Sequence, residues 1–246
     1  MVPKMFNKFI SISKEITDFL IESGVPIEKI IQIPTGVDSR VFRPLKSIED
    51  KISLRVKLGL PTNKITFLFV GRLVEGKGID TLLEAWKLFE KTNNDCMLVI
   101  VGDVNKNKGK ISNSSKPWVK SIDDVRVKNV DFLGFRNDVN KLMQASDIFV
   151  FPSLSEGLPN VVIEAMMSGL PIIASDIPGN SDLISNNLNG ILVPVKNAKA
   201  FSEAMNLLTG NKKLCNKMGK MNRGLAKKNF DLDIISEKFM ELIEEI

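Results

Sequence analysis

The sequence predicts an α/β fold, namely a doubly wound parallel sheet of the Rossmann-like kind. From Ile65 onward, short apolar runs alternate with amphipathic segments, the pattern of strands followed by covering helices. The runs are continuous rather than alternating with polar residues, as is typical of strands buried on both faces. Six βα-type units follow one another along the chain, which favours the doubly wound arrangement.

The first unit carries the clearest signals. Residues 65–70, ITFLFV, form an unbroken apolar run, and residues 71–78, GRLVEGKG, follow as a turn. Ile79, Leu82 and Trp86 then repeat at the spacing of one helical face. The other expected elements are strands at 96–102, 130–134, 148–153, 171–175 and 189–194, and helices at 138–146, 159–169, 198–210 and 236–246.

Two segments depart from this pattern. Residues 103–124 are rich in Lys, Asn and Ser without a period, so we expect a surface loop or a partly disordered insert. Residues 1–45 indicate a strand, a helix and a short strand, then a PTGVD turn and a linker at Pro44. We therefore expect residues 1–45 to be the end of a preceding domain, and residues 46–246 to be a second domain whose last helix packs back toward it.

Composition excludes several kinds of chemistry. The chain has no His, so a His base or His metal ligand is excluded, and two Cys far apart make a zinc site or a disulfide improbable. No secretory signal is recognisable, and with two reduced thiols this favours the cytoplasm. The net charge is +5, but the lysines are scattered among asparagines with no basic stripe between aromatics. We therefore expect a solvated surface and no nucleic-acid partner.

The turn at 71–78 is the first candidate site. It reads G-x-x-x-x-G-K, but Gly78 stands where a nucleotide hydrolase needs Ser or Thr to hold magnesium. An ATPase is therefore disfavoured. Glycines allow close approach of a ligand to the backbone, and Arg72 and Lys77 could both reach one phosphate group without a metal. An ordinary glycine turn with solvated cations is the alternative.

Residues 153–175 form a more specific second site. Glu156 and Glu164 lie eight residues apart, with a Gly-Leu-Pro turn between them. A helix that begins near Asn160 would leave the amides of Asn160, Val161 and Val162 pointing at an anion. The two carboxylates suit hydroxyls of a ribose and a sugar better than phosphate. The alternative is a pair of surface glutamates beside a helix start.

A third site could form where two predicted strands end. Gly102 and Asp103 follow one strand, and Gly134, Phe135 and Arg136 follow the next. Such loop tips could meet a base or a ribose through backbone atoms. Ordinary βα turns would look the same.

Taken together, these motifs resemble the group 1, retaining glycosyltransferases of the GT-B fold, which use nucleotide-sugar donors. The similarity runs over nearly the whole chain, from the junction at residues 9–44 through the 71–78 loop to the segments at 130–135, 148–180 and 189–194. Its most specific element is the E-x₇-E spacing of Glu156 and Glu164. The chain departs from the family pattern at PTGVD, usually PNGVD, and at Ser181–Asp182, where a Pro-Glu pair is common.

The resemblance implies roles for the residues singled out above. Arg72 and Lys77 would bind the donor diphosphate and stabilise the leaving nucleotide, with Glu156 on the sugar hydroxyls as the third catalytic residue. Glu164 would hold the ribose, with no metal and no cofactor. The implied donor-binding residues are Gly71, Gly134, Phe135, Gly157, Leu158, Asn160, Val161 and Glu164.

The resemblance also implies an incomplete enzyme. Residues 46–246 correspond to the C-terminal, donor-binding half, and residues 1–45 to a remnant of the acceptor half, so apolar residues such as Phe6, Ile10 and Phe19 should lack partners. We expect little or no transfer by the chain alone. A separate chain could supply the acceptor domain, and a lipid-linked acceptor would imply peripheral membrane association. The alternative is a non-catalytic nucleotide-sugar-binding remnant or a subunit of a split glycosyltransferase.

Overall fold

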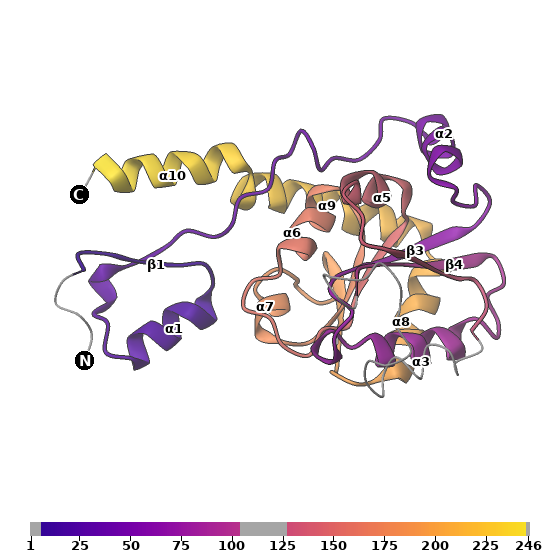
Figure 1. The fold of residues 1–246 in the computed structure, drawn as a ribbon, viewed down its shortest axis with the longest axis horizontal. Coiled ribbons are helices and arrows are strands. Elements are labelled where there is room, and N and C mark those ends of the chain that lie inside the picture. Colours follow the sequence, from indigo (N-terminus) through magenta and orange to yellow (C-terminus); the bar gives the residue numbers. More distant parts are fainter. Residues whose placement is uncertain (1–5, 104–126, 245–246) are drawn as a thin grey trace.

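The computed structural model describes residues 6–103 and 127–244 (Figure 1). The loop expected at 103–124 lies outside these residues, apart from Asp103. No described helix combines the length and the apolar character that crossing a bilayer requires.

A six-stranded, fully parallel sheet is the centre of the molecule, with the strand order β5-β4-β3-β6-β7-β8. The predicted doubly wound α/β fold is therefore confirmed. The chain runs outward from β3 to β5 and then returns to β6 on the other side of β3. The helices that follow the adjacent strands β3 and β6 therefore lie on opposite faces of the sheet (Figure 1). Ligands bind at such a switch point in open α/β sheets. The strands are Ile65–Val70 (β3), Cys96–Val101 (β4), Val130–Gly134 (β5), Ile148–Phe151 (β6), Ile172–Ser175 (β7) and Gly190–Val193 (β8).

Helices cover both faces of this sheet. Figure 1 shows α3 and α8 on one face, and α5, α6 and α9 on the other. The core beneath α3 is aromatic, because Trp86 and Phe89 pack edge-on against Phe67 of β3. The helices are Ile79–Phe89 (α3), Val139–Ala145 (α5), Asn160–Met167 (α6), Pro178–Ser181 (α7), Ala198–Thr209 (α8) and Lys212–Phe230 (α9).

Three helices were not expected from the sequence, namely α7, α9 and α2, which spans Ile48–Leu58. Helix α2 has ordinary end signals: the Ser47 hydroxyl accepts a hydrogen bond from the Asp50 amide, and Gly59 closes the helix in the left-handed region at φ 72°. Helix α9 begins in the same way, with the Asn211 side chain accepting from the Leu214 amide. The packed faces of α2 and α9 include polar residues, so their sequences show no clear hydrophobic repeat at helical spacing.

Residues before Pro34 form a small unit of their own. Strands β1 (Phe9–Ser11) and β2 (Ile30–Gln32) pair in parallel around helix α1 (Lys14–Glu22). Helix α10 (Leu232–Glu244) lies against this unit, where Ile235 and Leu242 form a cluster with Ile33. Of the apolar residues expected to lack partners, Phe6, Ile10, Ile12 and Phe19 are exposed and Leu20 is half-buried.

Two chain passages join this unit to the sheet domain. Val37 forms a parallel bridge with Asp231, just where α9 gives way to α10. The Arg223 guanidinium of α9 donates to the carbonyls of Ser39, Phe42 and Met167, which ties the linker to the domain.

A partly buried ion-pair network holds α2 on the sheet. Asp147 accepts from Lys51 and from Arg55, both at 2.6 Å, and from the Thr66 amide at 2.7 Å. Although burial alone would raise the pKa of Asp147, the two cations hold it below its usual value. Burial lowers the pKa of Lys51, and the nearby charge of Arg55 lowers it further, while Asp147 offsets part of this effect. Arg55 also donates to the carbonyls of Ala145 and Lys64.

We expect Asp147→Ala to lower the free energy of unfolding by about 1–3 kcal/mol, because it leaves buried Arg55 and half-buried Lys51 without their anion. Asp138→Ala removes a more exposed pair, with Arg136, and should cost less than about 1 kcal/mol. Since the pKa of Asp147 is depressed, its stabilisation is complete above the ordinary value of 3.8 and is lost as the pH falls through the lower folded value. Chemical denaturation of both variants checks this, and equal losses would contradict it.

Candidate functional site

The loops after β3 and β6 are packed against each other at the switch point of the sheet. The Gly76 carbonyl accepts from the Leu154 amide at 2.9 Å. Gly78 lies in the left-handed region at φ 65°, and a Cβ there would come within 2.1 Å of the Pro152 carbonyl oxygen. Only glycine therefore fits at the position where a nucleotide hydrolase has its hydroxyl.

This packing brings a cation and a carboxylate together from separate loops. Lys77 forms an ion pair with Glu156, and both side chains are largely buried. The Ser153 hydroxyl donates to the same Glu156 oxygen at 2.5 Å. The Lys77 ammonium also lies 5.6 Å from the centre of the Phe151 ring. Arg72, earlier in the same loop, is exposed.

Helix α6 starts at Asn160, after Pro159 as its N-terminal cap. The Val162 amide donates to the Pro159 carbonyl at 2.9 Å. The expectation that the amides of Asn160, Val161 and Val162 all stay unpaired is therefore wrong for Val162, because a tight first turn uses its N–H group. Among the described residues, no backbone carbonyl accepts a hydrogen bond from the amide of Asn160 or Val161.

Glu164 lies one turn into α6 in an apolar setting. Burial raises the pKa of its carboxyl group to about 7. Within residues 6–103 and 127–244 no cation or hydrogen-bond donor compensates it. A partly buried carboxyl group without a partner is a candidate for binding a ligand.

The ends of β4 and β5 form the third predicted loop pair. The Gly102 amide donates to the Gly134 carbonyl at 2.9 Å, and a Cβ on Gly102 would lie 1.8 Å from the Gly71 carbonyl oxygen. Phe135, after Gly134, exposes 72% of its surface. Arg136 pairs with Asp138 in its own turn.

Gly179 supports the second loop, and the sequence reasoning missed it. A Cβ there would come within 2.4 Å of the Glu156 carbonyl oxygen and 2.6 Å of the Gly157 carbonyl oxygen. The Pro-Gly pair that opens α7 was the available signal. Gly157 itself has open space around it, while Leu158 and Val161 pack against the main core.

The arrangement offers a phosphate the Lys77 ammonium group and the exposed Arg72 guanidinium group on one loop, and two helix amides after the loop that packs against it. Two carboxyl groups, of Glu156 and Glu164, can accept hydrogen bonds from hydroxyl groups nearby. Among the described residues, no three His, Cys, Asp or Glu side chains gather as a metal site would require.

Comparison with known proteins places the sequence in a family. Residues 50–224 match the family model described as "Glycosyl transferases group 1". The chain is 34% identical over 224 residues to the UDP-Gal:alpha-D-GlcNAc-diphosphoundecaprenol alpha-1,3-galactosyltransferase of Escherichia coli, covering 87% of this chain and 55% of the relative. It is 29% identical to the N,N'-diacetylbacillosaminyl-diphospho-undecaprenol alpha-1,3-N-acetylgalactosaminyltransferase of Campylobacter jejuni, covering 99% of this chain and 61% of the relative.

Solved structures show the same fold. Anabaena HepE in complex with UDP-glucose superposes with a TM-score of 0.85 at 22% identity, over 99% of this chain and 65% of HepE. The C-terminal domain of LpcC, a group 1 family protein of Francisella tularensis, superposes with a TM-score of 0.69 at 23% identity, over 80% of this chain and all of that domain. The chain spans little more than half the length of the curated relatives above.

Stability should depend on the ionisation of Glu164. Its folded pKa of about 7 lies above the ordinary value of 4.5, so the folded state holds the proton more tightly than the unfolded state. The resulting stabilisation is complete below the ordinary value and is lost as the pH rises through 7, by about 1–3 kcal/mol. Glu164→Gln should remove this dependence and be more stable than the parent at pH 8. Glu84→Gln, at an exposed position, should leave the pH dependence of stability as it is in the parent. Identical profiles of stability against pH for the parent and both variants would refute the prediction.

Gly179→Ala should displace the Glu156–Gly157 backbone, because the added methyl group has no space beneath it. We expect a loss of about 1–3 kcal/mol in the free energy of unfolding. Gly224→Ala is the matched control: this glycine is exposed within α9 with open space around it, so the change should stabilise by about 0.5–1 kcal/mol. Thermal melting of both variants measures these changes in stability. A Gly179→Ala variant as stable as the parent would contradict the prediction, because the loop would then move aside without cost.

Proposed function

The chain belongs to the group 1 glycosyltransferases, and from this premise we propose that residues 46–246 bind a nucleoside-diphosphate sugar for transfer with retention of anomeric configuration. The observation that carries the proposal is the meeting of Lys77 and Glu156 at the switch point of the sheet. The 71–78 and 153–159 loops thus present a cation for a diphosphate and a carboxylate for sugar hydroxyls side by side. Retention rests on the family resemblance.

The two cations would neutralise the leaving diphosphate. We propose that Arg72 and the ammonium of Lys77 hold its oxygens, together with the amides at the start of α6. Because these charges are fixed before the reaction, they would stabilise the negative charge that develops as the glycosidic bond breaks, without a metal. Lys77 would then exchange part of its contact with Glu156 for the phosphate, freeing that carboxylate for the sugar.

The remaining residues would orient the two ends of the donor. Glu164 has no protein partner among the described residues, and its carboxyl group would gain hydrogen bonds from the ribose hydroxyls. Exposed Phe135, on the αL turn at Gly134, would lie against the base. Gly71 and the backbone of Gly157 and Leu158 would approach the phosphates and the sugar closely.

The acceptor is proposed from the named relatives. The relatives from E. coli and C. jejuni are named for transfer to sugars on diphospho-undecaprenol, so we propose a polyprenol-diphosphate-linked sugar as acceptor. We place its binding outside residues 46–246, in a further region or a separate chain. The 246-residue chain should then bind donor and transfer little. Unpaired Cys96 and Cys215 are consistent with a cytoplasmic protein.

Donor titration tests this function. Calorimetry with UDP-, GDP- and ADP-sugars should reveal binding of at least one of them, and Arg72→Ala should weaken it by about 10- to 100-fold, because a charge-assisted contact is lost. Arg72 is exposed, so this variant should keep its fold. Arg43→Ala, at an exposed linker arginine, is the control and should bind as the parent does.

Absence of binding by all three donor classes would refute the donor site. Donor binding without transfer, even when a chain supplying the acceptor side is added, would instead support a non-catalytic binding subunit.

A further inference from the structure

Helix α9 carries a large share of the positive charge of the chain. This helix holds seven of the 34 Lys and Arg residues and no Asp or Glu, so the other 27 cations are outnumbered by all 29 acidic residues. Met218, Asn222 and Ala226 pack inward, and the opposite half of the helix carries the lysines. These lysines are exposed, as expected of a solvated surface, and the helix gathers them on one side. We call the exposed lysines the α9 cationic face: Lys212, Lys213, Lys217, Lys220, Lys227 and Lys228.

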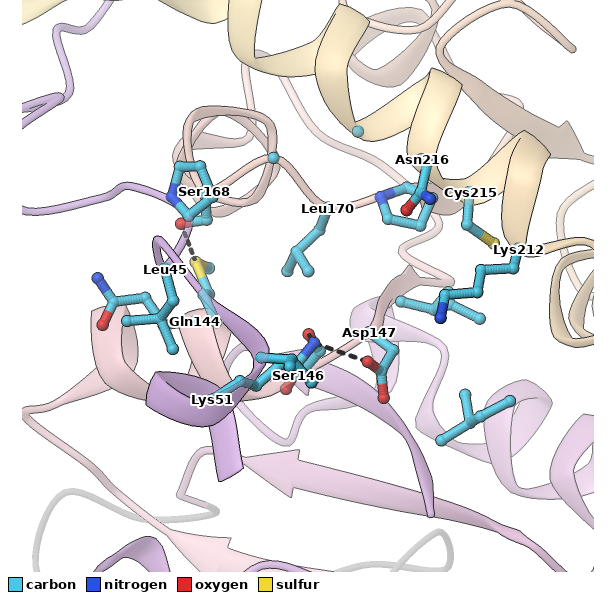
Figure 2. Close-up of a pocket in the computed structure, with 18 of the residues that line it drawn as sticks. Leu45, Lys51, Gln144, Ser146, Asp147, Ser168, Leu170, Lys212, Cys215 and Asn216 are labelled. Atoms are coloured by element: carbon cyan, nitrogen blue, oxygen red, sulfur yellow. Dashed lines mark hydrogen bonds and ion pairs between the residues drawn. The ribbon is translucent and has the colours of Figure 1, made fainter. Parts of the chain in front are cut away.

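A groove of about 1070 Å³ lies beside this face, at the amino ends of β3 and β6 (Figure 2). Lys212 and Lys220 of α9 contribute to one wall, and α2 with the linker before it forms another. Helix α2 exposes three aliphatic residues at four-residue spacing, Ile48, Ile52 and Val56, at 61%, 43% and 66%. These three residues, called the α2 stripe, lie on one side of the helix, and Ile48 also lines the groove.

The groove is poorly suited to a small anion, because its inner cations are already occupied. The guanidinium groups of Arg55 and Arg223 donate hydrogen bonds to backbone carbonyls, and that of Arg55 also donates to Asp147. Lys51 donates to the same carboxylate. What remains free is a row of flexible lysines along a helix and an aliphatic stripe nearby. This combination matches an extended, negatively charged surface with an apolar interior.

We propose that the α9 cationic face and the α2 stripe dock this domain on an anionic lipid bilayer. The lysines would lie at the phosphate headgroups, and the aliphatic side chains would enter the boundary with the acyl chains. Single-stranded nucleic acid suits the surface less well, because its recognition uses aromatic stacking and the described lining of the groove has no aromatic residue.

The groove lies at the amino ends of β3 and β6, whereas the donor loops follow the carboxyl ends of the same strands. Docking through the groove side would therefore leave the donor loops accessible. Helix α9 starts at the groove and ends at Phe230, which lines a smaller pocket together with Leu158 of the second donor loop and Ser13 of the N-terminal unit. The proposal goes beyond the transfer reaction and does not require the donor site to be correct.

Vesicle flotation with the full chain tests the proposal. The chain should float with vesicles that contain phosphatidylglycerol, remain behind with pure phosphatidylcholine, and detach at high salt. Lys213→Glu, Lys217→Glu and Lys228→Glu together should weaken partitioning by roughly a hundredfold. The matched control makes the same charge change on the other face of the sheet, through Lys87→Glu, Lys91→Glu and Lys199→Glu, and should change partitioning less than about threefold.

The aliphatic contribution has its own variant. Ile52→Ser with Val56→Ser should weaken partitioning by about tenfold, since each exposed side chain inserts apolar area. Equal binding to neutral and anionic vesicles, or equal loss in both charge variants, would overturn the proposal. It would also fall if the serine variant bound unchanged and a soluble DNA duplex competed fully. Donor titration of the same variants is a separate readout, so failure of membrane binding is distinguishable from failure of the donor site.

Discussion

The close approach of the residue 78 backbone to the Pro152 carbonyl sets the geometry on which the site depends. With only 2.1 Å available to a side chain, Gly78 is the residue that lets the turn after β3 rest on the end of β6. Lys77 precedes that glycine, and Glu156 follows Pro152 by four residues, so the ion pair between them is a consequence of the backbone contact. Gly102 likewise leaves no space for a side chain beside the Gly71 carbonyl, and Gly179 leaves none beside the carbonyls of Glu156 and Gly157. Three glycines in the segments that follow β3, β4 and β7 thus allow these close backbone contacts.

The carboxyl groups of Glu156 and Glu164 lie in different environments. Glu156 has a cation and a hydroxyl group as partners, whereas Glu164 lies in apolar surroundings with its pKa raised to about 7. Glu164 has no partner among residues 6–103 and 127–244, so a ligand that completes the site would offset the cost of its burial. This difference between the two carboxyl groups follows from burial and not from their spacing in the sequence.

The sheet could be predicted from the sequence because unbroken apolar runs, as in residues 65–70 and 148–151, leave few alternatives to buried parallel strands. Helix α9 could not, because its inward face includes Gly219 and Asn222. Asn222 is fully buried and satisfied by the carbonyls of Leu170 and Asn189, a polar contact that a hydrophobic period does not register. The candidate loops were recognisable from their glycines and charged residues. That Lys77 reaches Glu156, and that Val162 spends its amide within the helix, depends on backbone torsions that no spacing encodes.

The two passages between the N-terminal unit and the sheet domain constrain how these parts can move. Val37 and Asp231 run side by side and are bridged, while Arg223 anchors the linker from Ser39 onward to the domain. The bridge joins the chain that enters the sheet domain to the chain that leaves it. Any displacement of the N-terminal unit must therefore carry both passages together or break this bridge.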